Sequence, residues 1–182
     1  SDDPLFVELV EALHQLNPSA NSAYYLGLLN DKKGKTKLAI NYYNESIKLE
    51  TSDLKKAKTL YKIALKFKKS RQYSQSRSYA LKALKFQPSM GSAYLLIGNL
   101  YASSANNCGT SQFEKRAIYW LAAKEAKKAS AVDASVRRIA RKTALSYEGR
   151  APSKTDIFSE AMGGKIISIK CWIGKSIKVP SL

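Results

Sequence analysis

The sequence of 182 residues has few of the features by which enzymes and membrane proteins are recognised. It holds one histidine, His14, and none of the patterns H-E-x-x-H, C-x-x-C and G-x-S-x-G, nor a phosphate-binding loop. No stretch approaches the roughly 18 uncharged apolar residues that a membrane span needs. We therefore expect a non-enzymatic protein that has no catalytic residues, cofactor or metal site and does not insert into a membrane.

Proline is scarce as well, which together with the apolar content argues against a disordered chain. Only five prolines occur and 45% of the residues are hydrophobic, so the chain can bury a sizeable core. The opening segment LFVELVEALHQL carries two glutamates and no basic leader, so it does not read as a signal peptide. Its periodicity predicts a helix whose apolar side consists of Leu5, Leu9, Ala12, Leu13 and Leu16.

Acidic residues are missing from a long central stretch. Between Leu54 and Phe113 there is no aspartate or glutamate, whereas the same stretch has eleven lysines and arginines and the chain carries a formal charge of +17. Repulsion among like charges costs stability, which suggests an anionic partner. The alternative is that the lysines only solvate helix surfaces, and both interpretations stay open.

The sequence contains two similar segments. PSANSAYYLGLLN occupies residues 18–30, and PSMGSAYLLIGNLY occupies residues 88–101. In the second segment Tyr94, Ile97, Gly98 and Tyr101 match the spacing W-x2-L-G-x2-Y that opens a tetratricopeptide repeat. These offsets place the residues on one helical stripe, in which a glycine lets a second helix approach closely.

The chain thus resembles the tetratricopeptide repeat family over about residues 20–134. The resemblance implies an all-α solenoid of antiparallel helix pairs, because each pair buries its apolar face against the next. The implied domains are a terminal helix of an upstream repeat at 1–17, three repeats within 18–134 (20–53, 57–90 and 91–134, the last with an inserted loop at 102–113), a capping helix at 135–150 and a C-terminal extension at 151–182.

The C-terminal extension changes periodicity from helical to alternating. Ile167, Ile169, Cys171 and Ile173 alternate with polar residues and with Trp172, which is typical of a strand. Gly174 and Lys175 predict a two-residue turn, so we expect a β-hairpin at 166–179. Because an isolated hairpin is marginal in water, it should lie against the last helices, anchored by Trp172 or the isoleucines.

Residues 106–179, with NNCG, YEGRAPSKTDIF and CWI, are similar to the C-terminal half of a group of exported bacterial tetratricopeptide proteins of unassigned role. Lys170 stands where that group usually has glycine. The resemblance implies an exported or periplasmic location, and a cytoplasmic one stays open. In an oxidising compartment a Cys108–Cys171 bridge would stabilise the fold by about 4 kcal/mol. The alternative is two unpaired thiols.

Proteins of the tetratricopeptide family bind partners on the concave surface lined by first helices. The resemblance implies a protein- or peptide-binding scaffold with a basic groove that takes an acidic partner segment. Tyr24 and Leu28 replace the lysine and asparagine of the family's carboxylate clamp, so that clamp does not transfer. The alternatives are binding of a polyanion, either nucleic acid or an acidic glycan, and an architectural fragment of a larger repeat protein. The groove residues are Asn21, Tyr24, Tyr25, Lys58, Tyr61, Lys62, Leu65, Lys68, Lys69, Ser92, Leu95 and Asn99.

Overall fold

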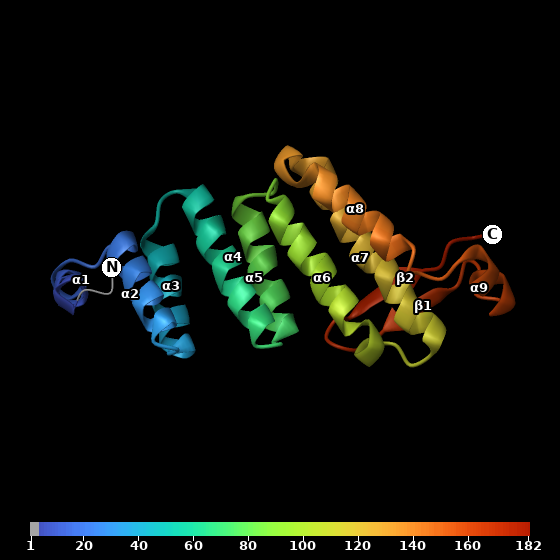
Figure 1. Ribbon diagram of the computed structural model, residues 1–182, viewed down its shortest axis with the longest axis horizontal. Helices are drawn as coiled ribbons and strands as arrows, with labels where there is room; N and C mark the ends of the chain where they lie inside the picture. Colours follow the sequence, from blue (N-terminus) through green and yellow to red (C-terminus); the bar gives the residue numbers. More distant parts are fainter. Residues whose placement is uncertain (1–3) are drawn as a thin grey trace.

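The computed structural model describes residues 4–182 as a row of antiparallel helix pairs that ends in a small β-hairpin (Figure 1). The two ends of the described chain lie at opposite ends of the row. The predicted all-α solenoid with a C-terminal hairpin is confirmed. The elements are α1 (Pro4–Leu16), α2 (Ala20–Lys32), α3 (Thr36–Leu49), α4 (Asp53–Lys69), α5 (Tyr73–Phe86), α6 (Gly91–Cys108), α7 (Gln112–Val132), a 3₁₀ turn (Ala134–Val136), α8 (Arg137–Glu148), α9 (Lys154–Ser159), β1 (Ile166–Ile169) and β2 (Lys175–Lys178).

Small residues allow the paired helices to approach closely. The most extensive packing joins α2 to α3, α4 to α5, and α6 to α7. Ala39, Ala64, Ala80 and Ala117 are completely buried. A Cβ atom on Gly98 would lie only 2.8 Å from the carbonyl oxygen of Ala122, so α6 and α7 meet at a distance that a larger residue would prevent. This is the close approach that the repeat pattern predicts.

Polar side chains fix where several helices begin. Ser19 accepts a hydrogen bond from the backbone amide of Ser22 and starts α2 with a capping box. Ser52 and Ser111 accept from the amides three residues ahead and start α4 and α7. Each cap satisfies a backbone donor that has no partner within its helix. Among residues 4–182, no helix has the length and apolar character needed to cross a membrane.

The predicted loop at 102–113 is wrong. Helix α6 continues to Cys108 and α7 begins at Gln112, so the additional residues lengthen both helices of the pair. Ala105 and Phe113, which lie inside the predicted loop, are buried. A longer helix pair satisfies the backbone hydrogen-bonding groups internally and removes apolar surface from water, which an open loop would not do.

The predicted apolar side of α1 is also wrong. Val10 is buried against Leu26 and Leu29 of α2, and Phe6 and Val7 pack beside it. The helix is therefore rotated so that its phenylalanine and valines, rather than its leucines, meet α2. The leucines are exposed: Leu5 by 72%, Leu9 by 64%, Leu13 by 52% and Leu16 by 86%.

The hairpin is antiparallel, with Ile167 opposite Ile177, and it packs on α7. Its connection spans residues 170–174, because Lys175 already pairs with Ile169, so the predicted two-residue turn is wrong. The longer connection leaves room for Cys171 and Trp172 to reach the helices. Cys171 forms a disulfide with Cys108 at the end of α6, which is the predicted pairing.

Trp172 and Arg77 anchor the hairpin connection. The indole nitrogen of Trp172 donates to the Ser104 hydroxyl of α6 at 3.0 Å. Arg77 of α5 donates to the backbone carbonyls of Trp172 at 3.1 Å and Ile173 at 2.6 Å. Its guanidinium also lies 5.1 Å from the Trp172 ring. Residues almost a hundred positions apart in the sequence therefore hold the hairpin on the helices.

We expect the double variant Cys108→Ser/Cys171→Ser to lose about 2–4 kcal/mol of unfolding free energy, because the unfolded chain gains the freedom that the bridge across 63 residues removes. Urea denaturation in non-reducing buffer measures the loss. A reductant should destabilise the wild type and leave the double variant unchanged. Titration of two free thiols in the native, unreduced protein would contradict the disulfide.

We expect Arg77→Ala to lower the unfolding free energy by about 2–3 kcal/mol, because hydrogen bonds from a charged donor to two carbonyls are lost. The control is Arg138→Ala, at an exposed position of α8, which should change stability by no more than about 0.5 kcal/mol. Hydrogen exchange at the Ile167 and Ile177 amides should speed up only in the Arg77 variant. Equal exchange in both variants would show that Arg77 does not hold the hairpin.

Candidate functional site

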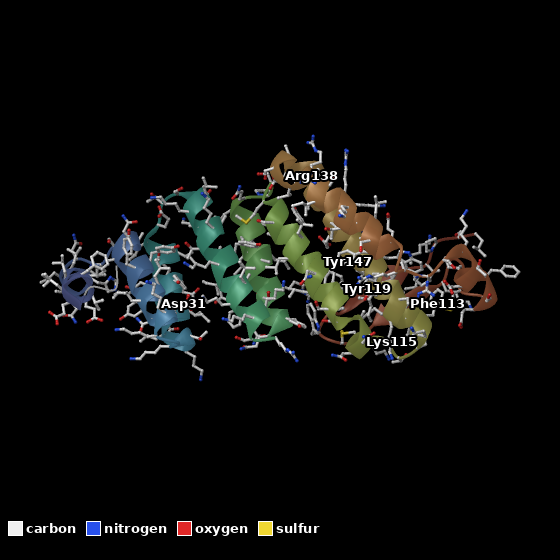
Figure 2. The ribbon with its side chains drawn as sticks, in the orientation of Figure 1. Asp31, Phe113, Lys115, Tyr119, Arg138 and Tyr147 are labelled. Atoms are coloured by element: carbon white, nitrogen blue, oxygen red, sulfur yellow. A yellow bond between two sulfur atoms is a disulfide. The ribbon has the colours of Figure 1, made fainter. Side chains whose placement is uncertain are left out.

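The predicted groove residues lie on α2, α4 and α6, the first helices of successive pairs. These helices follow one another along one side of the row, since Lys62 of α4 is hydrogen-bonded to Tyr24 of α2 and α4 contacts α6. Figure 2 shows Asp31 on α2 toward one end of this row and Tyr147 on α8 toward the other.

Four of the predicted residues meet in one cleft between α2 and α4. The cleft has a volume of about 280 Å³ and is lined by Asn21, Tyr24 and Tyr25 of α2 and by Lys58 of α4. The Tyr25 side chain is 47% exposed, so its ring is open to a ligand. Lys55 stands at the same cleft and pairs with Glu50 at 3.7 Å. The cleft thus combines aromatic surface with a partly neutralised basic rim.

Lys62 holds α4 to α2. Its Nζ donates to the Tyr24 hydroxyl at 3.2 Å and lies 5.0 Å from the Tyr24 ring centroid and 5.3 Å from that of Tyr43. One helical turn further on, Lys66 forms an ion pair with Asp31. Burial raises the pKa of the Tyr43 hydroxyl, so this ring stays neutral beside Lys62 at physiological pH. Lys62 therefore positions Tyr24. Its positive charge is engaged by the Tyr24 and Tyr43 rings.

The other predicted residues do not join the α2–α4 cleft. Tyr61 of α4 is partly buried and packs against a cluster that includes Ala93 of α6, and Ser92 is half-buried. Asn99 of α6 is half-buried. Leu65 and Lys69 are exposed on α4, whereas Lys68 and Leu95 are half-buried.

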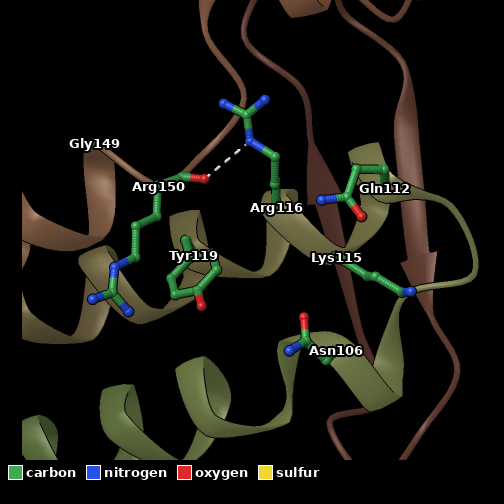
Figure 3. Close-up of a pocket in the computed structure, with 7 residues that line it drawn as sticks. All are labelled: Asn106, Gln112, Lys115, Arg116, Tyr119, Gly149 and Arg150. Carbon is green, nitrogen blue, oxygen red and sulfur yellow. Dashed lines mark hydrogen bonds between the residues drawn. The ribbon is translucent and has the colours of Figure 1, made fainter.

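A second cavity, of about 410 Å³, lies where α6 ends, α7 begins and α8 ends (Figure 3). The sequence did not predict this cavity, because a loop was expected at 102–113. The cavity walls depend on the lengthened helices. The only local signal is the run of polar and basic residues around the start of α7. Its lining includes Asn106, Gln112, Lys115, Arg116, Tyr119 and Arg150.

Arg116 fixes one wall of this second cavity. Its guanidinium pairs with Asp156 at 3.0 Å and donates to the backbone carbonyls of Arg150 at 3.2 Å and Ala151 at 2.9 Å. These bonds tie the start of α7 to the segment that follows α8. The Arg150 guanidinium itself lies 5.6 Å from the Tyr119 ring. Arg116 is therefore a structural cation, and Arg150 is held by the ring beneath it.

The start of α7 is set by close packing and by a carboxylate. A Cβ atom on Gly109 would lie 2.3 Å from the backbone nitrogen of Lys115, so only glycine allows α6 to end against α7 here. The hydroxyl and backbone amide of Thr110 both donate to Glu114. These bonds hold the pKa of Glu114 below its usual range and are helped by the amide of Ser111.

The basic character of the second cavity is not balanced by its lining, which includes no carboxylate. In residues 4–182, the ion pairs involve neither Lys115 nor Arg150. The same part of the chain has no group of three histidine, cysteine or acidic side chains placed to hold a metal ion. The side chains that line the two cavities offer hydrogen-bonding groups, positive charge and aromatic rings.

No protein-family model matches the chain, and no curated protein matches its sequence. The tetratricopeptide interpretation therefore rests on the residues of the repeated segments and on the paired helices.

As the pH falls, we expect the start of α7 to loosen only below the usual carboxyl pKa of about 4.3. Because the folded-state pKa of Glu114 is lowered, its contribution is present above that usual value and is lost as the pH drops through the folded one. The Thr110 amide shift in NMR spectra reports the midpoint. Glu114→Gln should abolish the titration, and a midpoint at or above the usual pKa would refute the prediction.

Proposed function

We propose that the protein is a non-enzymatic binding scaffold of the tetratricopeptide type, which holds an extended acidic peptide segment along its row of first helices. The α2–α4 cleft is the anchoring point. The observation that carries this proposal is that Asn21, Tyr24, Tyr25 and Lys58, selected by their repeat positions, line one cleft.

The chemistry of the cleft suits a peptide with carboxylate side chains. Lys58 is exposed at the rim and supplies charge, Asn21 supplies an amide for backbone hydrogen bonds, and Tyr25 supplies a ring for apolar contact. Lys62 holds Tyr24 in place, so the aromatic wall is formed before the peptide arrives. Such preorganisation lowers the entropy cost of binding.

The disulfide supports an oxidising location for this scaffold. Disulfides persist in exported and periplasmic proteins and are rare where thiols are kept reduced. The Cys108–Cys171 bridge fits the exported group that the C-terminal segment resembles. We therefore propose that the peptide partner lies outside the cytoplasm.

The second candidate function is binding of a polyanion such as nucleic acid or an acidic glycan. The observation in its favour is the stretch from Leu54 to Phe113, with eleven basic and no acidic residues. Arginine, which reads nucleic-acid bases in bidentate fashion, occurs in that stretch only as Arg71 and Arg77. Arg77 is engaged with the hairpin, so the peptide function is preferred.

A library of ten-residue peptides, with four glutamates at fixed positions and the other six positions randomised, tests the peptide function. Fluorescence anisotropy then measures the affinity of the selected peptides. We expect saturable binding that Lys55→Glu/Lys58→Glu weakens at least about tenfold, since two cations at the cleft are reversed. A single-stranded oligonucleotide serves as the polyanion probe.

The matched control for the peptide experiment is Lys82→Glu/Lys85→Glu on α5, which changes the net charge equally at exposed positions outside the cleft. It should weaken binding by no more than about threefold, through long-range charge alone. Equal weakening by both variants would contradict the cleft. Tight oligonucleotide binding, with no selection of acidic peptides, would favour the polyanion function.

A further inference from the structure

The second cavity concentrates positive charge that the protein does not neutralise. Lys115 lies one turn into α7, near the end at which the helix dipole is itself positive. Arg116 is paired with Asp156, but neither Lys115 nor Arg150 has an ion-pair partner among the described residues. A bound anion would relieve this repulsion, whereas a neutral ligand would not.

The same cavity offers uncharged hydrogen-bonding groups between its two cations. Asn106 and Gln112 contribute side-chain amides, and Tyr119 contributes a hydroxyl. Figure 3 shows Tyr119 and Asn106 directed toward one another across the space between α7 and α6, with Arg150 on one side and Lys115 on the other. Amides and hydroxyls that both donate and accept are suited to the hydroxyl groups of a sugar.

The walls of the cavity are held in place without a ligand. The disulfide fixes the end of α6 beside Asn106, and the contact of Gly109 with Lys115 sets the start of α7. Arg116 binds the backbone on the opposite side. The volume of about 410 Å³ lies within the range of small-ligand sites. The cavity is thus open, polar and preorganised.

We propose that this cavity binds an acidic saccharide, namely a sugar that carries a carboxylate or a phosphate group. Arg150 contacts the anionic group on one side of the cavity, the Asn106 and Gln112 amides and the Tyr119 hydroxyl contact the sugar hydroxyls, and Lys115 adds positive charge on the opposite side. The site is separate from the α2–α4 cleft and does not depend on the peptide function.

NMR titration of the ¹⁵N-labelled full chain tests this proposal with four probes: glucuronate, glucose 6-phosphate, glucose and inorganic phosphate. We expect saturable shifts at the start of α7 and the end of α8 with glucuronate or glucose 6-phosphate, and binding at least about tenfold weaker with glucose or phosphate alone. The first two probes distinguish a carboxylate ligand from a phosphate ligand.

Lys115→Gln/Arg150→Gln should weaken binding of the acidic sugar at least about tenfold, because two charged hydrogen-bond donors are removed. The matched control, Arg138→Gln/Lys142→Gln, removes the same charges from exposed positions of α8 outside the cavity and should bind normally. An unchanged amide spectrum away from the cavity shows that each variant is folded.

Three results would overturn the proposal. They are no saturable shift with either acidic sugar, equal affinity for inorganic phosphate and glucose 6-phosphate, and equal weakening in both double variants. The first would show that the cavity is only a solvated surface, the second that the sugar is not recognised, and the third that net charge alone attracts the ligand. Failure of peptide binding at the α2–α4 cleft would not bear on the saccharide proposal.

Discussion

The close approach of paired helices is the constraint on which the rest of the structure depends. Completely buried alanines such as Ala64 and Ala117, and Gly98 against the carbonyl oxygen of Ala122, let each pair meet without a thick layer of large side chains. A thin pair has little core of its own and must bury its remaining apolar face against the next pair. The row of first helices, and hence the α2–α4 cleft, follows from this packing.

The C-terminal hairpin covers one end of the row, where it packs on α7. Arg77, Trp172 and the disulfide bring the hairpin connection onto α5 and α6 from a distant part of the sequence. The covered end then supports longer helices than the earlier repeats have. The cavity at Lys115 exists only because α6 and α7 are extended in this way, so the hairpin and the second site are linked.

The sequence predicts what is local and periodic. Stripe spacing was enough for the helix pairs, for the close approach at Gly98, and for placing Tyr24 and Lys58 on first helices that face each other. Stripe spacing did not predict the helices at residues 102–113, because the burial of Phe113 depends on contacts with residues distant in the sequence. It also failed for α1, in which the leucine side and the valine side are both apolar and only contact with α2 decides between them. The engagement of Lys62 with Tyr24 likewise depends on the distance between two helices, which periodicity does not set.

The two cavities are expected to act independently, and the reason is the shape of the fold. In a row of helix pairs each element contacts mainly its neighbours, so a local disturbance is transmitted only through successive interfaces. The α2–α4 cleft and the cavity at the start of α7 are separated by α5 and by much of α6, and their linings have no residue in common. Coupling between them would require a two-state element that both ligands bias, such as a sliding interface. The bonds of Arg77 to the hairpin oppose such sliding, because they would have to break.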